Sequence, residues 1–326
     1  MIVLAGDVGG TNARLATVEL NGGTARIAQQ SRYPSGDYPG LTPIVRGFCE
    51  GLASRPDRAC FGIACPVVGD ECTAPNLPWT VNARKLADEI GISRTTIIND
   101  FVAAGYAIGM LGPSDLLTLQ EGSPIPQGPI ALIGAGTGLG QGFLLWEGDH
   151  YRVLPSEGGH GDFAPRGELQ TGLLQFLRRR FGRVSWERLL SGAGMVNAYN
   201  HLLASGAAPE RETVRDEMEK EDPAAVITRH GLEKTDDLSD RALDLFCDVL
   251  GAQAGNLALT VIATGGVYLA GGIAPRIAER LKSGPFLTAF RDKGRMAELL
   301  TRIPVHVIMN PNVGLLGAAA VAARLA

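Results

Sequence analysis

The stretch that decides the fold is residues 3–19, which read Val-Leu-Ala-Gly-Asp-Val-Gly-Gly-Thr-Asn-Ala-Arg-Leu-Ala-Thr-Val-Glu. Apolar runs at 2–4 and 15–18 flank a turn with two glycines, and this pattern predicts a β-hairpin. Gly9 and Gly10 let the backbone approach a ligand closely and point successive N–H groups at it, as an anion site requires. The turn is therefore a candidate phosphate site, and a plain glycine turn is the alternative interpretation.

Polar side chains accompany this turn. Thr11 adds a hydroxyl donor, Arg14 adds a cation, and Asp7 stands two residues before the glycines. A carboxylate next to a phosphate repels it unless a cation lies between them, and Mg²⁺ is the usual cation. Asp7 is thus a candidate magnesium ligand, with capping of the turn as its alternative role.

Length and composition limit the class of protein. The 326 residues exceed what one hydrophobic core usually holds, so we expect two domains. Hydrophobic residues make up 45% of the chain and charged residues 20%, as in an ordinary globular protein. The net charge of −4 argues against nucleic acid as a partner.

The five cysteines are odd in number and lack paired CxxC spacing. We therefore expect reduced, mostly buried thiols in a cytoplasmic protein, without a disulfide framework or a zinc site. The sequence has no pattern typical of a signal peptide and no unbroken apolar stretch of ~20 residues, so a membrane is not an expected partner.

The first half of the chain predicts a β-β-β-α-β-α-β-α order. After the hairpin we expect a strand from residue 26, a helix over 41–54, a strand over 59–66, a helix over 82–90, a strand over 95–100 and a helix over 101–111. Asn99 and Asp100 lie at the carboxyl end of a strand, where α/β sheets place their ligands. The alternative is that Asp100 caps the helix that follows.

A similar scheme restarts after the loop-like segment 113–128, which is a plausible boundary between domains. Apolar runs at 130–133 and 142–146 flank a second glycine turn, 134–140, in which Thr137 corresponds to Thr11. Two such turns suggest duplicated halves that grip nucleotide phosphates. The dinucleotide, Walker A and protein-kinase signatures are absent, because Leu139 replaces the third glycine of GxGxxG and no lysine follows a glycine.

Polar residues gather in the segment 154–165, which holds Glu157, His160 and Asp162 among glycines. Side chains of this kind on a loop suit a sugar, because each sugar hydroxyl needs a donor or an acceptor. Glu187 adds to this set, and a surface loop is the alternative.

The rest of the chain is mostly helical. Residues 204–240 are rich in charge and predict a solvated helical excursion, and helical spacing resumes over 240–259. We then expect a buried strand that ends in Gly271 and Gly272, a helix from Pro275, a strand over 303–309 and a helix over 314–325. The glycine pair leaves room for a flat ring such as adenine, although a tight β-α turn explains it equally well.

Five motifs in this order resemble the bacterial glucokinase family of the actin/hexokinase/Hsp70 ATPase superfamily. They are Asp-Val-Gly-Gly-Thr-Asn-Ala-Arg at 7–14, Ile-Asn-Asp-Phe at 98–101, Gly-Ala-Gly-Thr-Gly-Leu-Gly at 134–140, Glu-Gly-Gly-His at 157–160 and Ala-Gly-Gly-Ile-Ala-Pro at 270–275. The resemblance implies a two-lobed α/β actin-like ATPase fold of duplicated, ribonuclease H-like β-β-β-α-β-α units with a cleft between the lobes. The expected domains are 1–111, completed by 303–326, and 112–302.

The resemblance also implies transfer of the ATP γ-phosphoryl group to the 6-hydroxyl of D-glucose, with Asp100 as general base. It implies glucose contacts from Asn99, Asp100, Glu157, His160, Glu187 and Asn76. The expected nucleotide-binding residues are Asp7, Gly9, Gly10, Thr11, Asn12, Gly136, Thr137, Gly138, Gly271 and Gly272. Mg²⁺ is expected at Asp7 through water, and the family suggests a cytoplasmic homodimer.

Two departures accompany the resemblance. The zinc-binding cysteine cluster of the related ROK sugar kinases is missing, which is typical of the zinc-free glucokinases. In the segment 75–79, Asn76 and Trp79 match the family pattern, while Pro75 and Leu77 do not.

Three rival functions remain open at this point. The first is a kinase for another hexose, such as mannose or fructose, because hexoses share most of their hydroxyls. The second is a sugar-binding regulator, which the acidic charge and the strand at residue 2 disfavour. The third is a sugar-independent ATPase, which would have no use for Glu157, His160 and Glu187.

Overall fold

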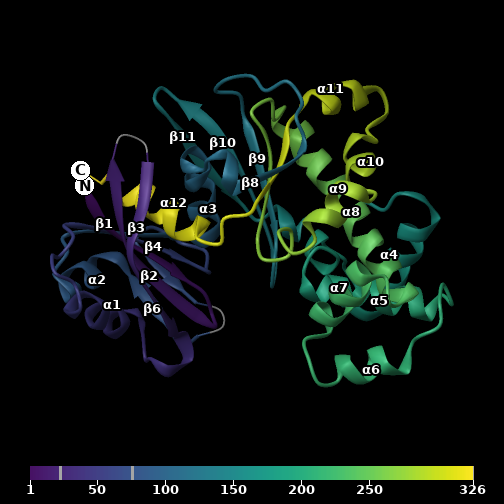
Figure 1. Ribbon diagram of the computed structural model, residues 1–326, viewed down its shortest axis with the longest axis horizontal. Helices are drawn as coiled ribbons and strands as arrows, with labels where there is room; N and C mark the ends of the chain where they lie inside the picture. The colour runs from purple at the N-terminus through teal and green to yellow at the C-terminus, as the bar shows by residue number, and fades with distance from the viewer. Residues whose placement is uncertain (22–23, 75–76, 326) are drawn as a thin grey trace. The chain divides into compact units, whose positions relative to one another are not determined.

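The computed structural model describes residues 1–21, 24–74 and 77–325, which form two compact units (Figure 1). Unit 1 comprises Met1–Asp115, His150–Leu154 and Asn310–Ala326, and unit 2 comprises Leu116–Asp149 and Pro155–Met309. Each unit has its own sheet and its own hydrophobic core. The strand β11 (His150–Ser156) runs across the boundary between the two groups of residues.

Unit 1 is built on a five-stranded sheet in the order β3-β2-β1-β4-β7. The strands are β1 (Ile2–Val8), β2 (Asn12–Asn21), β3 (Thr24–Pro34), β4 (Arg58–Ile63) and β7 (Arg94–Asn99). The first three are antiparallel, while β4 runs parallel to β1 and β7 runs parallel to β4. The predicted N-terminal hairpin is confirmed, and its register sets Asp7 opposite Arg14.

Helices cover both faces of this sheet. The helices of unit 1 are α1 (Leu41–Glu50), α2 (Ala83–Ile90), α3 (Asp100–Ala107) and α12 (Val313–Ala322). The apolar side chains of α1 and α2 pack with one face of the sheet, and those of α12 pack with the other. The expected helices at 41, 82 and 101 are confirmed, although α1 ends at Glu50, before the predicted residue 54.

Short elements complete unit 1. They are η1 (Ser35–Asp37), β5 (Glu71–Thr73), β6 (Thr80–Asn82), η2 (Ile108–Met110) and η3 (Pro113–Asp115). β5 and β6 pair as a small antiparallel sheet of their own. The Asn82 side chain at the end of β6 caps α2, because it accepts hydrogen bonds from the N–H groups of Arg84 and Lys85.

Unit 2 repeats the strand scheme of unit 1. Its strands are β8 (Leu116–Gln120), β9 (Ile130–Ala135), β10 (Leu139–Glu147), β12 (Gly266–Ala270) and β13 (Val305–Ile308). β9 and β10 form an antiparallel hairpin, and β12 and β13 follow in parallel on the other side of β9. In each sheet the first hairpin strand therefore has its hairpin partner on one side and two parallel strands on the other. This repetition agrees with the predicted duplication.

The helices of unit 2 surround one large core. They are α4 (Gly167–Phe181), α5 (Gly192–Ala204), α6 (Glu212–Met218), α7 (Pro223–Glu233), α8 (Asp237–Val261), α9 (Ala278–Ser283), α10 (Phe286–Arg291) and α11 (Ala297–Arg302). Three 3₁₀ turns connect them: η4 (Gly158–His160), η5 (Trp186–Arg188) and η6 (Gly294–Met296). The 25-residue helix α8 is the centre of this core, where its side chains pack with those of α5 and α10.

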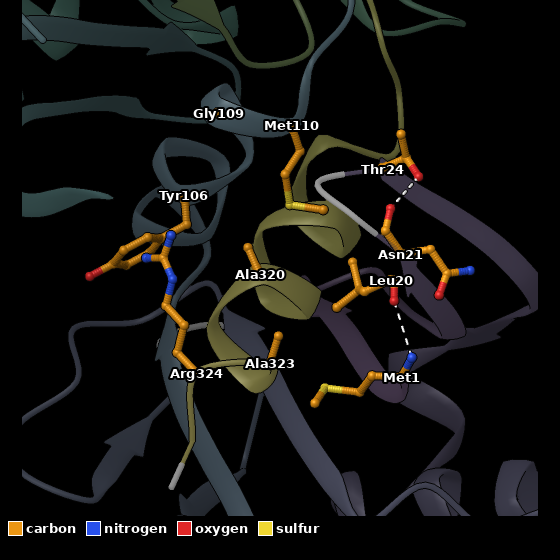
Figure 2. A pocket seen from close by; sticks show the side chains of 10 residues that line it. All are labelled: Met1, Leu20, Asn21, Thr24, Tyr106, Gly109, Met110, Ala320, Ala323 and Arg324. Carbon is orange, nitrogen blue, oxygen red and sulfur yellow. Dashed lines mark hydrogen bonds between the residues drawn. The ribbon is translucent and has the colours of Figure 1, made fainter. Parts of the chain in front are cut away.

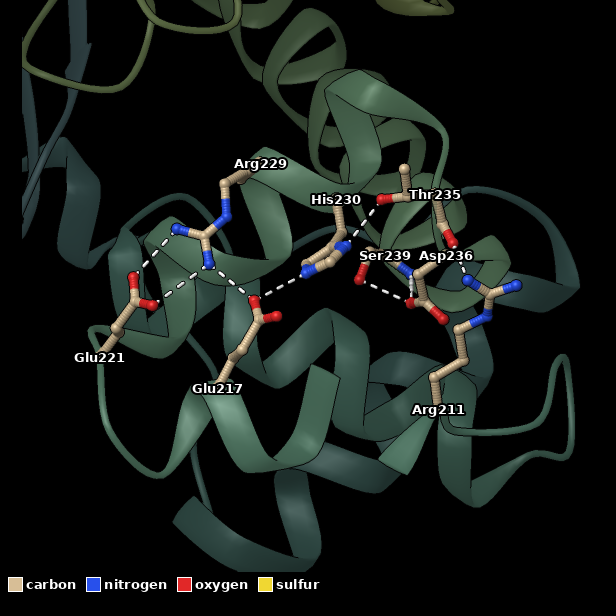
Figure 3. A network of polar contacts seen from close by, with 8 residues as sticks. All are labelled: Arg211, Glu217, Glu221, Arg229, His230, Thr235, Asp236 and Ser239. Atoms are coloured by element: carbon tan, nitrogen blue, oxygen red, sulfur yellow. Dashed lines mark hydrogen bonds and ion pairs between the residues drawn. The ribbon is translucent and has the colours of Figure 1, made fainter. Parts of the chain in front are cut away.

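The charged segment 204–240 is helical, as expected, and a polar network holds it together (Figure 3). Glu217 on α6 accepts hydrogen bonds from Arg229 and shares one with the His230 ring on α7, at 2.7 and 2.9 Å. Arg229 also binds Glu221. These contacts join α6, which has few apolar residues, to α7, whose Val226 and Ile227 are buried.

Three expectations about unit 2 are wrong. The segment 113–128 is not only a loop, because β8 lies within it and pairs with β13. The strand over 303–309 does not belong with the first domain: β13 pairs with β12 in the second sheet, and only the chain from Asn310 onward joins unit 1. The helix expected from Pro275 begins at Ala278, because the left-handed Gly271 opens a run of turns first.

The five cysteines are buried free thiols, as predicted. Burial raises the pKa of Cys49, Cys60 and Cys247 above the ordinary value. Within the described residues, none of the helices combines the length and the apolar character that crossing a bilayer demands.

Candidate active site

The first glycine turn lies between β1 and β2 and is closed by one backbone hydrogen bond and one bond from a side chain. The Gly9 N–H donates to the Asn12 carbonyl at 2.9 Å, and the Ser35 hydroxyl donates to the Gly9 carbonyl at 2.8 Å. Among the described residues, the N–H groups of Gly10 and Thr11 meet no acceptor. Two free N–H groups in a tight turn are what an anion site needs.

Asp7 lies at the end of β1 next to this turn, and its carboxylate pairs with the Arg14 guanidinium across the hairpin. Arg14 also donates to the Pro311 carbonyl at 2.8 Å, just before α12. Gly314 in the first turn of α12 faces the same carboxylate, because a Cβ added there would lie 2.8 Å from Asp7 Oδ2. The structure thus surrounds Asp7 with a cation and a helix N-terminus.

Magnesium fits this part of the chain only with help from a substrate. Within the described residues, no group of three or more His, Cys, Asp or Glu side chains is placed to hold a metal ion. Mg²⁺ is commonly bound by one or two carboxylates together with substrate phosphates and water. Asp7, as a single carboxylate next to free N–H groups, is suited to that arrangement.

Asn99 and Asp100 lie at the junction of β7 and α3, as predicted. Asn99 caps the helix: its Oδ1 accepts from the N–H groups of Phe101 and Val102, at 2.9 and 3.2 Å. Its Nδ2 donates to the Cys65 carbonyl at 3.2 Å. Asp100 is the first helical residue and adds a bond from the Phe101 N–H at 2.8 Å. The capping role considered for Asp100 thus belongs mainly to Asn99.

The surroundings of Asp100 favour its protonated form. Burial is the main cause of its raised pKa, and the negative charge of Asp7 raises the pKa further. Hydrogen bonds from Phe101 and Asn99 act in the opposite direction. A carboxyl group with a raised pKa is a better proton acceptor when it is ionised, so Asp100 is suited to general-base chemistry.

The second glycine turn, between β9 and β10, repeats the design of the first. The Gly136 N–H donates to the Gly138 carbonyl at 2.9 Å, which closes the turn. The N–H groups of Thr137 and Gly138 have no acceptor among the described residues. The Gly136 carbonyl accepts from the Gly192 N–H at the start of α5. Both predicted phosphate turns therefore present two free N–H groups next to a threonine.

Gly271 and Gly272 lie beside this second turn. A side chain at Gly271 would overlap the Ala135 carbonyl oxygen, and its φ of +81° also requires glycine. Gly272 is different, since a Cβ added there would meet nothing within 4 Å. Its backbone N lies 3.9 Å from the position of a Cβ added at Gly136. The glycine pair thus leaves an open surface next to the turn, as a flat ring would need.

Glu157, His160 and Glu187 come together in unit 2. His160 Nε2 lies 3.8 Å from Glu157 Oε2, and His160 Nδ1 lies 3.9 Å from Glu187 Oε1. These distances exceed a hydrogen bond, and the three side chains remain partly or largely exposed, with 59% of His160 and 74% of Glu157 accessible. Polar groups that are close but not bonded to one another are free to bind a ligand.

Two contacts hold this loop against the segment of Glu187. Arg183 donates to the His160 carbonyl at 2.6 Å and pairs with Asp162 at 2.7 Å. The rings of Phe163 and Trp186 meet edge to face, 5.1 Å between centroids. The sequence does not indicate a role for Arg183, because a single arginine after a basic helix end carries no distinguishing pattern.

The structure also connects the candidate sugar-binding residues, Glu157, His160 and Glu187, to the second glycine turn. Glu187 Oε2 accepts a hydrogen bond from the Leu139 N–H at 3.0 Å. In unit 1 it brings Asp7, the first turn, Asn99 and Asp100 into one region. Of the predicted residues, Asn76 lies outside the part of the chain that the structure describes.

The chain is similar to known proteins over nearly its whole length. A family model described as Glucokinase matches residues 4–325. The glucokinase of Nostoc sp. is 47% identical over 340 residues, an alignment that covers 99% of this chain and 99% of that protein. The crystal structure of a glucokinase from an Antarctic psychrotroph is 31% identical with a TM-score of 0.87 and covers 99% of this chain and 98% of that one.

A more distant likeness concerns the fold alone. The crystal structure of a ROK family glucokinase from Streptomyces griseus, in complex with glucose and AMPPNP, has a TM-score of 0.69 at 20% identity. It covers 99% of this chain and 100% of that one. Together with the repeated sheets, these likenesses confirm the predicted α/β actin-like ATPase fold.

Proposed function

This chain belongs to the glucokinase family and is an ATP-dependent sugar kinase, and we propose that Asp100 is the base of its reaction. The reaction transfers the γ-phosphoryl group of ATP to the 6-hydroxyl of D-glucose and yields glucose 6-phosphate and ADP. The observation that carries the proposal is the position of Asp100, at the carboxyl end of β7 with a raised pKa beside Asp7.

Asp100 removes the obstacle to attack by the sugar. A hydroxyl group is a poor nucleophile until its proton can leave, and an ionised carboxylate within hydrogen-bond reach accepts that proton. The Phe101 N–H donates to Asn99 Oδ1 and to Asp100 Oδ1, and these bonds hold the α3 N-terminus, and hence Asp100, in one geometry. The nearby negative charge of Asp7 makes Asp100 more basic, which favours proton transfer from the hydroxyl.

The two glycine turns bind phosphate. In phosphoryl transfer, negative charge spreads over the oxygens of the transferred group, so fixed donors supply much of the catalysis. The free N–H groups of Gly10 and Thr11 in unit 1, and of Thr137 and Gly138 in unit 2, are donors of this kind. Asn12, whose Oδ1 accepts from Arg32 at 2.8 Å, and Gly136 hold the shape of the two turns.

Mg²⁺ is the metal that this site is suited to hold, with Asp7 as its protein ligand through water. When bound to ATP, it neutralises phosphate charge. Arg14 keeps the Asp7 carboxylate in position, since the two side chains are paired across the hairpin. The adenosine would lie against Gly271 and Gly272. A side chain at Gly271 would overlap the Ala135 carbonyl, and a Cβ at Gly272 would meet nothing within 4 Å, which leaves open space there.

Glucose is bound through its other hydroxyls. Glu157, His160 and Glu187 offer acceptors and a donor whose positions are set by Arg183 and by the Phe163–Trp186 contact. Asn99, Asn76 and the Asp100 carboxylate complete the proposed set. A site built from such groups discriminates between sugars, because a missing or misplaced hydroxyl leaves a polar group unpaired.

The proposal also covers the domains of the chain, its oligomeric state and its location in the cell. The two units would correspond to the small and large domains predicted from the sequence, except that 112–115 and 150–154 belong to unit 1 and 303–309 belong to unit 2. The family also suggests a cytoplasmic homodimer, which light scattering at micromolar concentration would test.

The decisive experiment measures ADP release from Mg-ATP with glucose, mannose, fructose, N-acetylglucosamine or no sugar, for wild type and Asp100→Asn. We expect release that depends on glucose in the wild type and a loss of ~10²–10⁴-fold in the variant, with glucose affinity retained. Turnover of the variant near the wild-type rate would exclude Asp100 as the base. Release with another sugar would leave the mechanism in place and change the substrate.

A further inference from the structure

Unit 1 contains a pocket of about 360 Å³ that involves none of the residues assigned above (Figure 2). Three parts of the chain line it. The first is the end of β2 and the start of β3, with Leu20 and Thr24; the second is the end of α3 and η2, with Tyr106 and Met110; the third is the end of α12, with Ala320. The volume lies in the range of small-molecule sites, which is about 300–1,000 Å³.

The lining is mostly apolar, with the polar Asn21 and Thr24, and among the described residues its two cationic groups are the Arg324 side chain and the Met1 amino group, which donates to the Leu20 carbonyl. Leu20, Met110, Ala320 and Ala323 supply hydrocarbon surface. The exposed Arg324 places its guanidinium over the Tyr106 ring, 5.5 Å from the centroid, and Figure 2 shows these two side chains against each other. No carboxylate is among the described residues that line the pocket.

The charge balance decides the class of ligand. The carbonyl end of α12 lies here and carries a partial negative charge of roughly half an electron, which disfavours an anion. The full positive charge of Arg324 is larger and lies at the same helix end. We propose that this pocket is a regulatory site for a small amphipathic anion, with its apolar body on the hydrocarbon surface and its anionic head on Arg324.

Two helices connect the pocket with the catalytic region of the same unit. Helix α3 begins at Asp100 and carries Tyr106 of the pocket near its other end. Helix α12 faces the Asp7 carboxylate with Gly314 in its first turn, and it presents Ala320 to the pocket in its last turn. Each helix therefore has one end at a carboxylate of the proposed active site, Asp100 or Asp7, and the other at the pocket.

The two helices also pack directly on each other. A Cβ added at Gly317 of α12 would overlap the Ala103 carbonyl oxygen of α3, so the backbones are in contact at this crossing. Helices of 8 and 10 residues are ~12–15 Å long and move as stiff rods. A ligand that displaces their ends at the pocket therefore also shifts Asp100 on α3 and moves the first turn of α12 against the Asp7 carboxylate of β1.

Binding is tested first, and without any assay of activity. The probe is 2-naphthoate, compared with 2-naphthyl phosphate and with the neutral 2-naphthalenemethanol, in calorimetric titrations of the full chain. We expect both anions to bind the wild type more tightly than the neutral probe. Arg324→Gln should weaken each anion at least fivefold and leave the neutral probe within twofold. The matched control is Arg84→Gln, an exposed arginine paired with Asp70 outside the pocket, and it should change nothing. The tighter of the two anions identifies the head group as carboxylate or phosphate.

The second test fills the pocket with a larger side chain and measures whether the probes still bind. Ala320→Trp should abolish binding of all three probes. If thermal unfolding shows that this variant does not fold, Ala323→Phe is used in its place. Equal affinities in wild type and in the Arg324 and filled variants, or no binding to the wild type at millimolar concentration, would overturn the site.

Coupling to catalysis is tested separately, and it rests on the roles proposed for Asp7 and Asp100. A saturating anion should change the kcat for glucose phosphorylation at least twofold in the wild type and leave the filled variant unchanged. Binding without any change in kcat would overturn the regulatory role. Loss of the proposed catalytic roles would show as normal turnover of Asp100→Asn and would leave the binding results standing.

Discussion

The carboxylate of Glu187 accepts a hydrogen bond from the Leu139 N–H at 3.0 Å, although 48 residues separate the two in sequence. One side chain thus serves as a proposed sugar ligand and as a support of the second phosphate turn. This bond links the proposed sugar site to the proposed phosphate turn, so we expect loss of the carboxylate to affect both.

We predict that Glu187→Ala raises the KM for both glucose and ATP. A hydrogen bond to a charged group contributes ~1.5–3 kcal/mol, so each KM should rise about tenfold or more. Glu187→Gln keeps an acceptor for Leu139 and should raise the KM for glucose alone. The control is Glu157→Ala, at a largely exposed residue, which should also affect only glucose. An unchanged KM for ATP in Glu187→Ala would contradict the coupling.

Gly138→Ala is expected to disturb the same contact from the other side. A Cβ at this position would lie 2.6 Å from Glu187 Oε2, and the flexible carboxylate must move away. Because a side-chain end moves at little cost, activity should fall at least tenfold while the melting temperature stays within ~2 °C. Gly47→Ala on α1, where an added Cβ meets nothing within 4 Å, is the matched control and should retain full activity.

Asp100→Asn should stabilise the protein while it removes activity. Burial and then the charge of Asp7 raise the pKa of Asp100 in the folded state, so its ionised form opposes folding. This unfavourable contribution is absent below the unfolded pKa of ~3.9 and develops as pH rises through the folded-state pKa. The variant should therefore melt ~1–4 °C above the wild type at pH 7.5, with the difference shrinking towards pH 4. Asp88→Asn, at an exposed position of α2, should show no such gain; an unaltered melting temperature for Asp100→Asn at pH 7.5 would refute the argument.

Gly317→Ala should destabilise unit 1. The new methyl group would overlap the Ala103 carbonyl, and backbone atoms of two packed helices cannot yield cheaply. Overpacking of this kind costs ~1–3 kcal/mol or more, which urea unfolding measures directly. The control Gly47→Ala lies in a helix with open space, so it should instead gain ~0.4–1 kcal/mol. Equal stability of Gly317→Ala and wild type would mean that α3 and α12 separate easily, and the coupling proposed for the pocket would fail.

The polar network of α6 and α7 should stabilise the protein only while Glu217 is ionised. The hydrogen bond with His230, and then that with Arg229, lowers the pKa of Glu217 (Figure 3). A lowered folded-state pKa gives a stabilising contribution above the unfolded pKa, which is lost as pH falls through the folded-state value. Glu217→Ala should thus lower the melting temperature slightly at pH 7 and less so near pH 4. The neighbouring exposed Glu219→Ala serves as control, and a pH-independent effect of Glu217→Ala would argue against the ion pairs.

The sequence by itself determined the elements that depend on local pattern. The two hairpins, their glycine turns and the strand end at Asn99–Asp100 follow from alternation, glycine position and helix spacing within ~20 residues. The resemblance of five short motifs was enough to assign the family, because those motifs are themselves the turns and strand ends to which the chemistry is proposed to belong.

Only the tertiary structure decided the relations between distant segments. The sequence pattern predicts a loop at β8, because its short apolar run gains strand character only by pairing with β13, which follows nearly two hundred residues later. The bond from Asn99 Nδ2 to the Cys65 carbonyl, the support of Leu139 by Glu187 and the pocket at the ends of α3 and α12 depend in the same way on packing. A local pattern records which face of an element is apolar, whereas its partner is chosen by shape and hydrogen-bond geometry in three dimensions, which no single stretch of sequence contains.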